Sequence, residues 1–150
     1  HARALQRRRH HGHAHAPALL LLALAAAACG TQKSPTEPLA PVDPTATFTR
    51  VQMEIFTPSC ALSGCHAGGS PQAGMNLSAG VSYGQIVGVR ATESTRLRIA
   101  PGDAAGSYLV SKTAGDATIT GSRMPLGGPY LPDATQKLLA DWVRRGAPND

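Results

Sequence analysis

The chain has 150 residues, which is enough for one domain with accessory segments. It contains 16 Gly and 12 Pro but only one Trp, three Tyr and two Phe, so large side chains for a core are few and we expect a bound group to fill part of the interior. The net charge of +5 comes mainly from four arginines in the first nine positions; the other ten basic residues nearly balance the nine acidic ones, which argues against a nucleic-acid-binding surface.

Residues 1–28 have the pattern of an export signal peptide. A segment rich in Arg and His precedes an apolar run from Ala18 to Ala28, which is too short to cross a bilayer, where about 20 residues are needed. We therefore expect the protein to be exported from the cytoplasm. The chain begins with His1 rather than Met, so we also expect its start to be incomplete or misassigned.

The sequence around Cys29 fits two ways of cleaving this peptide. The segment Ala26-Ala27-Ala28-Cys29 is similar to a bacterial lipobox, in which Cys29 becomes the lipidated first residue of the mature protein. Ordinary cleavage after Ala28 would instead leave a free thiol. The count of three cysteines favours lipidation, because two belong to the motif below and an exposed odd thiol is unfavourable after export. We expect a lipid anchor at a bacterial membrane, on its periplasmic or outer face.

Residues 29–47 are predicted to be the lipidated N-terminus and a Pro-rich linker, followed by a folded domain over residues 48–150. Proline recurs at every third position, at Pro35, Pro38, Pro41 and Pro44. This period matches the three-residue turn of polyproline II. A disordered linker would do the same work, so in either case the segment is a spacer between anchor and domain.

The first helix of the domain is expected over residues 47–56. Phe48, Val51 and Ile55 recur at helical spacing and would form its apolar face. Pro58 is expected to end this helix, because proline lacks the backbone N–H that a continuing helix needs.

The segment Cys60-Ala-Leu-Ser-Gly-Cys65-His66 carries the most specific chemistry of the chain. A c-type haem needs two thiols that add across its vinyl groups and an adjacent imidazole that binds iron, and the usual motif is C-x-x-C-H. Here four residues separate the cysteines, a wider spacing that occurs in some multihaem cytochromes. Two other interpretations are a disulfide between Cys60 and Cys65 in an oxidising compartment and a zinc site, for which the sequence offers no further His or Cys pair after the leader.

Two further observations favour haem. Five of the six histidines lie within residues 1–28, so after removal of this leader only His66 remains, directly behind Cys65. Met124 lies 58 residues downstream of His66, and a thioether is a suitable sixth ligand that raises the reduction potential of haem iron. Met75 is the rival ligand, and a sixth position without a protein ligand is the other alternative.

Two more helices are predicted further along the chain. A short one is expected over 82–87, between Gly-rich loops. The last begins with a capping box of Asp133 and Gln136 and stops at Gly146, with Pro148 just beyond. Its apolar face comprises Leu138, Leu139, Trp142 and Val143.

Taken together, these motifs resemble the monohaem class I cytochrome c domains of exported bacterial lipoproteins. The resemblance covers residues 48–148, about two-thirds of the chain. It is carried by Cys60, Cys65 and His66 behind a first helix and by the segments Gly74–Leu77, Pro101-Gly102, Ser107–Leu109, Met124-Pro125 and Trp142–Ala147. It implies a small all-α fold in which Gly- and Pro-rich loops surround a covalently bound haem c. The first and last helices would cross beside the haem, with His66 as its proximal and Met124 as its distal iron ligand.

We therefore expect an electron carrier rather than an enzyme. It would pass one electron between redox partner proteins while a lipid at Cys29 holds it to the membrane. Two alternatives remain: a haem-dependent enzyme or sensor with an open sixth iron position, and a haem-free binding module stapled by a disulfide. Arg96, Arg98 and Lys112 are expected as solvated surface charges, with pairing to the haem carboxylates as the other interpretation.

Overall fold

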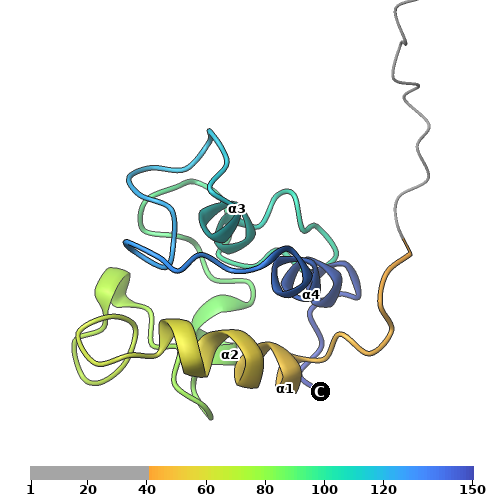
Figure 1. Ribbon diagram of the computed structural model, residues 1–150, viewed down its shortest axis with the longest axis horizontal. Coiled ribbons are helices and arrows are strands. Elements are labelled where there is room, and N and C mark those ends of the chain that lie inside the picture. Colours follow the sequence, from red (N-terminus) through yellow and green to blue (C-terminus); the bar gives the residue numbers. More distant parts are fainter. Residues whose placement is uncertain (1–40) are drawn as a thin grey trace, which may run out of the picture. The chain divides into compact units, whose positions relative to one another are not determined.

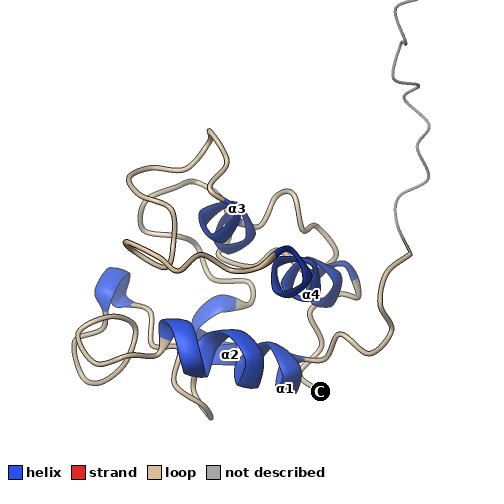
Figure 2. Cartoon of the chain, viewed as in Figure 1, coloured by secondary structure: helices blue, strands red, loops and turns tan. Residues whose placement is uncertain are grey.

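The computed structural model describes residues 41–150, which fold into helices joined by long loops (Figures 1 and 2). In chain order the elements are α1 (Phe48–Val51), the π-helix η1 (Gln52–Cys60), the short 3-10 helix η2 (Gln72–Gly74), α2 (Ser82–Ile86), α3 (Tyr108–Ala114) and α4 (Asp133–Arg144). Within these residues there are isolated β-bridges but no strands, which agrees with the predicted all-α class.

The first helix extends beyond its expected end. α1 continues directly into η1, and Pro58 lies inside this π-helix instead of terminating it. In an α-helix the proline ring would clash with the carbonyl group four residues earlier. The wider π turn, whose hydrogen bonds span five residues, moves that carbonyl away; the bond from Ala61 N–H to the Phe56 carbonyl (2.7 Å) has this span. The helix therefore carries the chain as far as Cys60.

The last helix forms where the apolar pattern predicts it, but only its C-terminal end has the predicted structure. The expected capping box is absent: Pro132 is the N-cap, no side chain caps the helix, and the Gln136 amide donates to the Val110 carbonyl instead (3.0 Å). At the other end Gly146, with φ +98°, donates to Val143, and Ala147 donates to Trp142. These two bonds make a Schellman motif, so Gly146 stops the helix as predicted.

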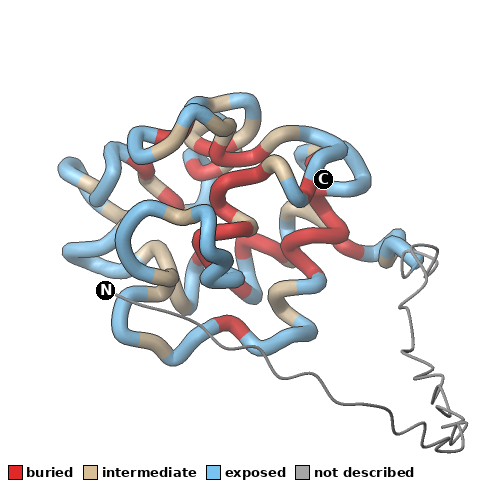
Figure 3. Tube along the Cα trace, turned by 90° about the horizontal axis from the view of Figure 1, so that it is seen from above, coloured by how far each residue is buried: buried red, intermediate tan, exposed pale blue. Residues whose placement is uncertain are grey.

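The core lies where α4 crosses the continuous helix α1–η1. Figure 1 shows α4 nearly end-on while α1 and η1 run across the view, and the buried segments gather in the middle of the domain (Figure 3). The Phe48 ring lies 5.4 Å from the Trp142 ring and 5.1 Å from the Tyr83 ring, between centroids. Trp142 is fully buried, and its indole N–H donates to the Pro148 carbonyl (2.9 Å). All four residues of the predicted apolar face of α4 are buried.

α2 matches the short helix predicted near residue 82, whereas α3 was not predicted. α3 packs against α4, and the Gln136–Val110 hydrogen bond joins the two helices. Gly115, in the left-handed conformation (φ +76°), ends α3 and turns the chain into a long loop that returns to α4.

The folded part begins upstream of the expected boundary at Phe48. Ala46 is fully buried in the core, and the backbone N–H of Asp43 donates to the Asp141 carboxylate (3.0 Å). Pro44 lies in a tight turn closed by a hydrogen bond from Ala46 to Asp43 rather than in an extended polyproline helix. The rest of the predicted linker, the signal peptide and Cys29 lie outside the described residues. In the part that the structure describes, no helix is long and apolar enough to cross a membrane.

Asp141 is the one carboxylate whose side chain has no exposed surface in residues 41–150. Burial alone would raise its pKa, but hydrogen bonds from Lys137, the Asp43 N–H and Arg144, together with the charge of Lys137, hold the pKa of Asp141 below its usual value. Its ionised form therefore stabilises the fold at neutral pH and ties the N-terminal segment to α4.

We expect Asp141→Asn to lower the free energy of unfolding by about 1–3 kcal/mol at pH 7, because charged hydrogen bonds are lost. Since the folded-state pKa is lowered, this contribution is present above pH ~4 and disappears as the pH falls below that value. Urea unfolding of wild type and variant at pH 7 and again below pH ~4 measures this difference in the free energy of unfolding. Asp133→Asn, which changes an exposed carboxylate of the same helix, is the control and should cost less than about 1 kcal/mol. A difference between wild type and Asp141→Asn that persists unchanged in acid would contradict this account.

Candidate functional site

The domain contains a cavity of about 590 Å³, a volume within the usual range for a site that binds a small molecule or cofactor. Its wall is mostly apolar and comes from the end of η1, the loop that follows η1, the segment between α2 and α3, α3 itself and the segment that follows α3. Cys60, Cys65, His66 and Met124 all contribute to this wall, so the structure brings together every predicted site residue that it describes.

The loop between the two cysteines closes on itself. The N–H of His66 donates to the Cys60 carbonyl (3.2 Å), and the N–H of Cys65 donates to the Leu62 carbonyl (3.0 Å). Gly64 is the third residue of the resulting turn and has φ +79°, a conformation that glycine adopts without strain. The four intervening residues are thus folded into a turn, and the backbone of His66 returns to that of Cys60.

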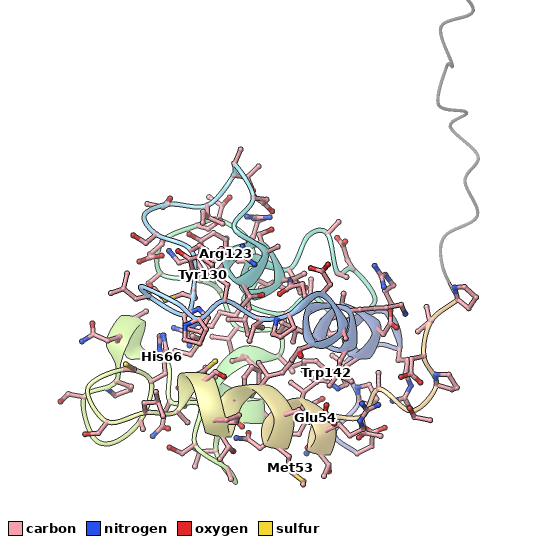
Figure 4. The ribbon with its side chains drawn as sticks, in the orientation of Figure 1. Met53, Glu54, His66, Arg123, Tyr130 and Trp142 are labelled. Carbon is pink, nitrogen blue, oxygen red and sulfur yellow. The ribbon has the colours of Figure 1, made fainter. Side chains whose placement is uncertain are left out.

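The imidazole of His66 is held by backbone carbonyls. Its Nδ1 lies 3.1 Å from the Gln72 carbonyl oxygen and 3.3 Å from that of Met75. Because a carbonyl oxygen only accepts hydrogen bonds, Nδ1 must carry the proton, and Nε2 of the neutral ring keeps its lone pair. Histidines that bind metals are oriented in this way, by a hydrogen bond from the other ring nitrogen. His66 is half-buried and lines the cavity; Figure 4 shows it below the loop that carries Arg123 and Tyr130.

The two thiols differ in their environment. Both are free: Cys65 is exposed, whereas Cys60 is half-buried and packs against the core. Burial, with a smaller effect of the neighbouring Cys65, raises the pKa of Cys60 to about 11. This position favours an uncharged sulfur, which a thiol or a thioether provides and a thiolate does not. In residues 41–150 no group of three or more His, Cys, Asp or Glu is arranged to bind a metal ion, so nothing here favours the zinc interpretation.

Both candidate methionines line the cavity. Met124 is half-buried on the segment that follows α3, and its N–H donates to the Lys112 carbonyl (2.9 Å). Met75 is buried in the core cluster and belongs to the segment whose carbonyls hold the His66 ring. Met124 is therefore the methionine on the wall formed by α3 and its loop, whereas Met75 comes from the same wall as His66.

Two basic residues expected on the surface are buried instead. Arg98 is only 7% exposed and lines the cavity, where its guanidinium donates to the carbonyls of Gln85 and Ala73, each at 2.8 Å. It forms no ion pair with any residue of the described part, and burial lowers its pKa. Lys112 is equally buried but pairs with Glu93 at 2.9 Å. Sequence reasoning missed both, because a buried charge has the same sequence pattern as an exposed one.

Comparison of the chain with protein-family models, with curated proteins and with solved structures finds no match in any of the three.

We expect the two thiols to react at different rates in the full chain produced without haem. A pKa of about 11 leaves only about one Cys60 in a thousand as thiolate at pH 8, and burial hinders the reagent, so iodoacetamide should modify Cys65 at least about tenfold faster. Mass spectrometry of the digested protein identifies the labelled residue. In guanidinium the two rates should become similar. Equal rates in the folded protein would contradict the assigned environments.

Proposed function

We propose that the protein is a c-type cytochrome that transfers one electron through a covalently attached haem c. The observation that carries this proposal is one large, mostly apolar cavity whose wall contains Cys60, Cys65, His66 and Met124 together. Residues far apart in the sequence thus face one space with the ligands that a c-type haem needs: two thiols, an imidazole and a thioether.

The residues present fit this group. Cys60 and Cys65 would hold the haem through two thioether bonds, which carry no charge and suit the buried Cys60 sulfur. The Nδ1 contacts of His66 leave Nε2 available for iron, and the Met124 sulfur would complete the ligand set. When bound, the haem iron supplies the one-electron chemistry, because it exists in two oxidation states.

Arg98 supports the same proposal independently of the motif. A guanidinium that is nine-tenths buried on a cavity wall, with no carboxylate partner in residues 41–150, is stabilised when an anionic group enters the cavity. The carboxylates of haem are such groups, and arginine binds carboxylates with two parallel hydrogen bonds. The apolar remainder of the wall would exclude water from the iron and favour the reduced state, in which Fe(II) and the porphyrin dianion together carry no net charge.

We extend the proposal to the fold, the partners and the location of the protein. The fold would be a class I-like cytochrome c, in which α1–η1 and α4 cross beside the haem. Leu62 and Leu126 are exposed residues that also line the cavity, so they offer an apolar rim for redox partner proteins. The leader and a lipid on Cys29 would place the domain outside the cytoplasm at a bacterial membrane. The protein would act as an electron carrier rather than an enzyme.

The direct test is a reduced-minus-oxidised visible spectrum with a pyridine haemochrome assay, on the full chain expressed beside a cytochrome c maturation system. We expect a sharp c-type alpha band that survives acid–acetone extraction. The double variant Cys60→Ala/Cys65→Ala is the control and should lose the covalent haem. A colourless wild-type protein, beside a control cytochrome that matures normally, would overturn the proposal in favour of a disulfide-stapled binding module.

A second prediction concerns the sixth ligand. Met124→Ala should lower the reduction potential, because a thioether ligand raises it, and should let carbon monoxide bind the reduced protein. The matched variant Met75→Ala should change neither property. The opposite pattern would make Met75 the ligand. No spectral change in Met124→Ala would indicate an open sixth position and favour a haem-dependent enzyme or sensor.

A further inference from the structure

Next to Met124 lies a polar cluster that the haem motif does not require, and three of its four members line the cavity. It consists of Glu93, Tyr108, Lys112 and Thr120, and we refer to it as the Glu93–Lys112 latch. Of its two charged residues, Lys112 is the more deeply buried. Its side chain is 9% exposed, and its ammonium group lies 2.9 Å from the Glu93 carboxylate. The Tyr108 hydroxyl donates to the same carboxylate (3.3 Å).

The latch joins three segments that are separate in the sequence. Glu93 comes from the loop before α3, Tyr108 and Lys112 come from α3, and Thr120 comes from the loop that leads to Met124. Both backbone polar groups of Thr120 are hydrogen-bonded to α3. Its N–H donates to the Tyr108 hydroxyl (3.0 Å), and its carbonyl accepts from Lys112 Nζ (2.5 Å). Its hydroxyl donates to the Glu93 carbonyl (3.2 Å).

Lys112 also touches the Met124 backbone directly. Its carbonyl accepts the N–H of Met124 (2.9 Å), while its side chain holds Thr120 four residues upstream. A single residue of α3 therefore fixes the approach of the loop and the residue at its end. The ion pair of an exposed lysine contributes little stability and rarely orders a loop. Removing the partner of a lysine that is nine-tenths buried costs much more free energy, because the buried charge is left unpaired.

We propose that the Glu93–Lys112 latch holds Met124 in position as the sixth ligand, so that Glu93 and Lys112 are positioning residues for the haem site. This inference rests on the proposed function. An external ligand such as imidazole must displace Met124, and its apparent affinity is reduced by the fraction of molecules in which Met124 stays in place. Loosening the latch should raise that affinity without removing any ligand.

The experiment titrates imidazole into the ferric holoprotein and follows the visible spectrum. We expect Lys112→Met and Glu93→Gln each to bind imidazole at least about tenfold more tightly than wild type. The double variant should add little to either single change, because both remove the same ion pair. Lys137→Met is the matched control: it also removes an ion-paired lysine, on α4 and outside the cavity wall, and should leave the affinity unchanged.

Hydrogen exchange gives a readout that does not need haem. The Met124 and Thr120 amides should exchange about tenfold faster in Glu93→Gln, while the α4 amides of Leu139 and Trp142 should keep their protection. Glu93 is exposed, so this variant tests the latch even where Lys112→Met does not fold. Unchanged exchange at Met124 in Glu93→Gln would overturn the proposal.

The two proposals fail in different ways. A haem-loaded wild type that binds imidazole as tightly as Met124→Ala would overturn Met124 as the sixth ligand and the positioning role with it. Normal spectra with unchanged imidazole affinity in both latch variants would overturn the latch alone. A colourless protein would overturn the proposed cytochrome, and with it the positioning of a sixth ligand.

Discussion

The crossing of α1–η1 with α4 is the contact on which the other elements depend. Phe48 lies between the rings of Trp142 and Tyr83 at this crossing. Because η1 is continuous with α1, this contact also fixes the position of Cys60 at the far end of the helix. α4 in turn is hydrogen-bonded to α3 through the Gln136 side chain, and the Lys112 carbonyl of α3 accepts the N–H of Met124. The buried crossing thus connects the two walls of the cavity.

The same crossing explains why a cavity exists in so small a domain. Phe48, Phe56, Tyr83 and Trp142 cluster there, and Tyr130 is exposed. Tyr108 alone among the aromatic residues reaches the cavity wall, and its hydroxyl is engaged by the latch. The large side chains are therefore used at one end of the domain, while the other end is enclosed by smaller residues and loops. The shortage of aromatic residues in the composition corresponds to this division.

Much of the helical framework could be predicted from the sequence, for a physical reason. The apolar face of α4 places Leu138 and Leu139 one turn before Trp142 and Val143, so its period is readable, and Gly146 stops the helix by backbone geometry alone. α3 has only seven residues, including the β-branched Val110 and Thr113, and its helix depends on packing against α4. Pro58 misled the prediction because the rule for proline assumes α-helical turns.

The site divides in the same manner. Cys60, Cys65, His66 and Met124 could be named from the sequence as candidates because each residue type suits the proposed haem chemistry, and the structure places all four on one cavity wall. Arg98 and Lys112 were not, because their roles depend on which loops cover them.

The cysteine spacing shows how local chemistry and fold combine. Attachment of the proposed haem would need the two cysteines close together in space, and a hydrogen-bonded turn from Leu62 to Cys65 takes up the additional residues. The hydrogen bond from His66 N–H to the Cys60 carbonyl then closes the loop around them. A longer interval in sequence is thereby converted into a short one through space, with Gly64 supplying the positive φ that the turn requires. The wider motif and the compact site are consistent because the turn, rather than the residue count, sets the distance between the two ends of the loop.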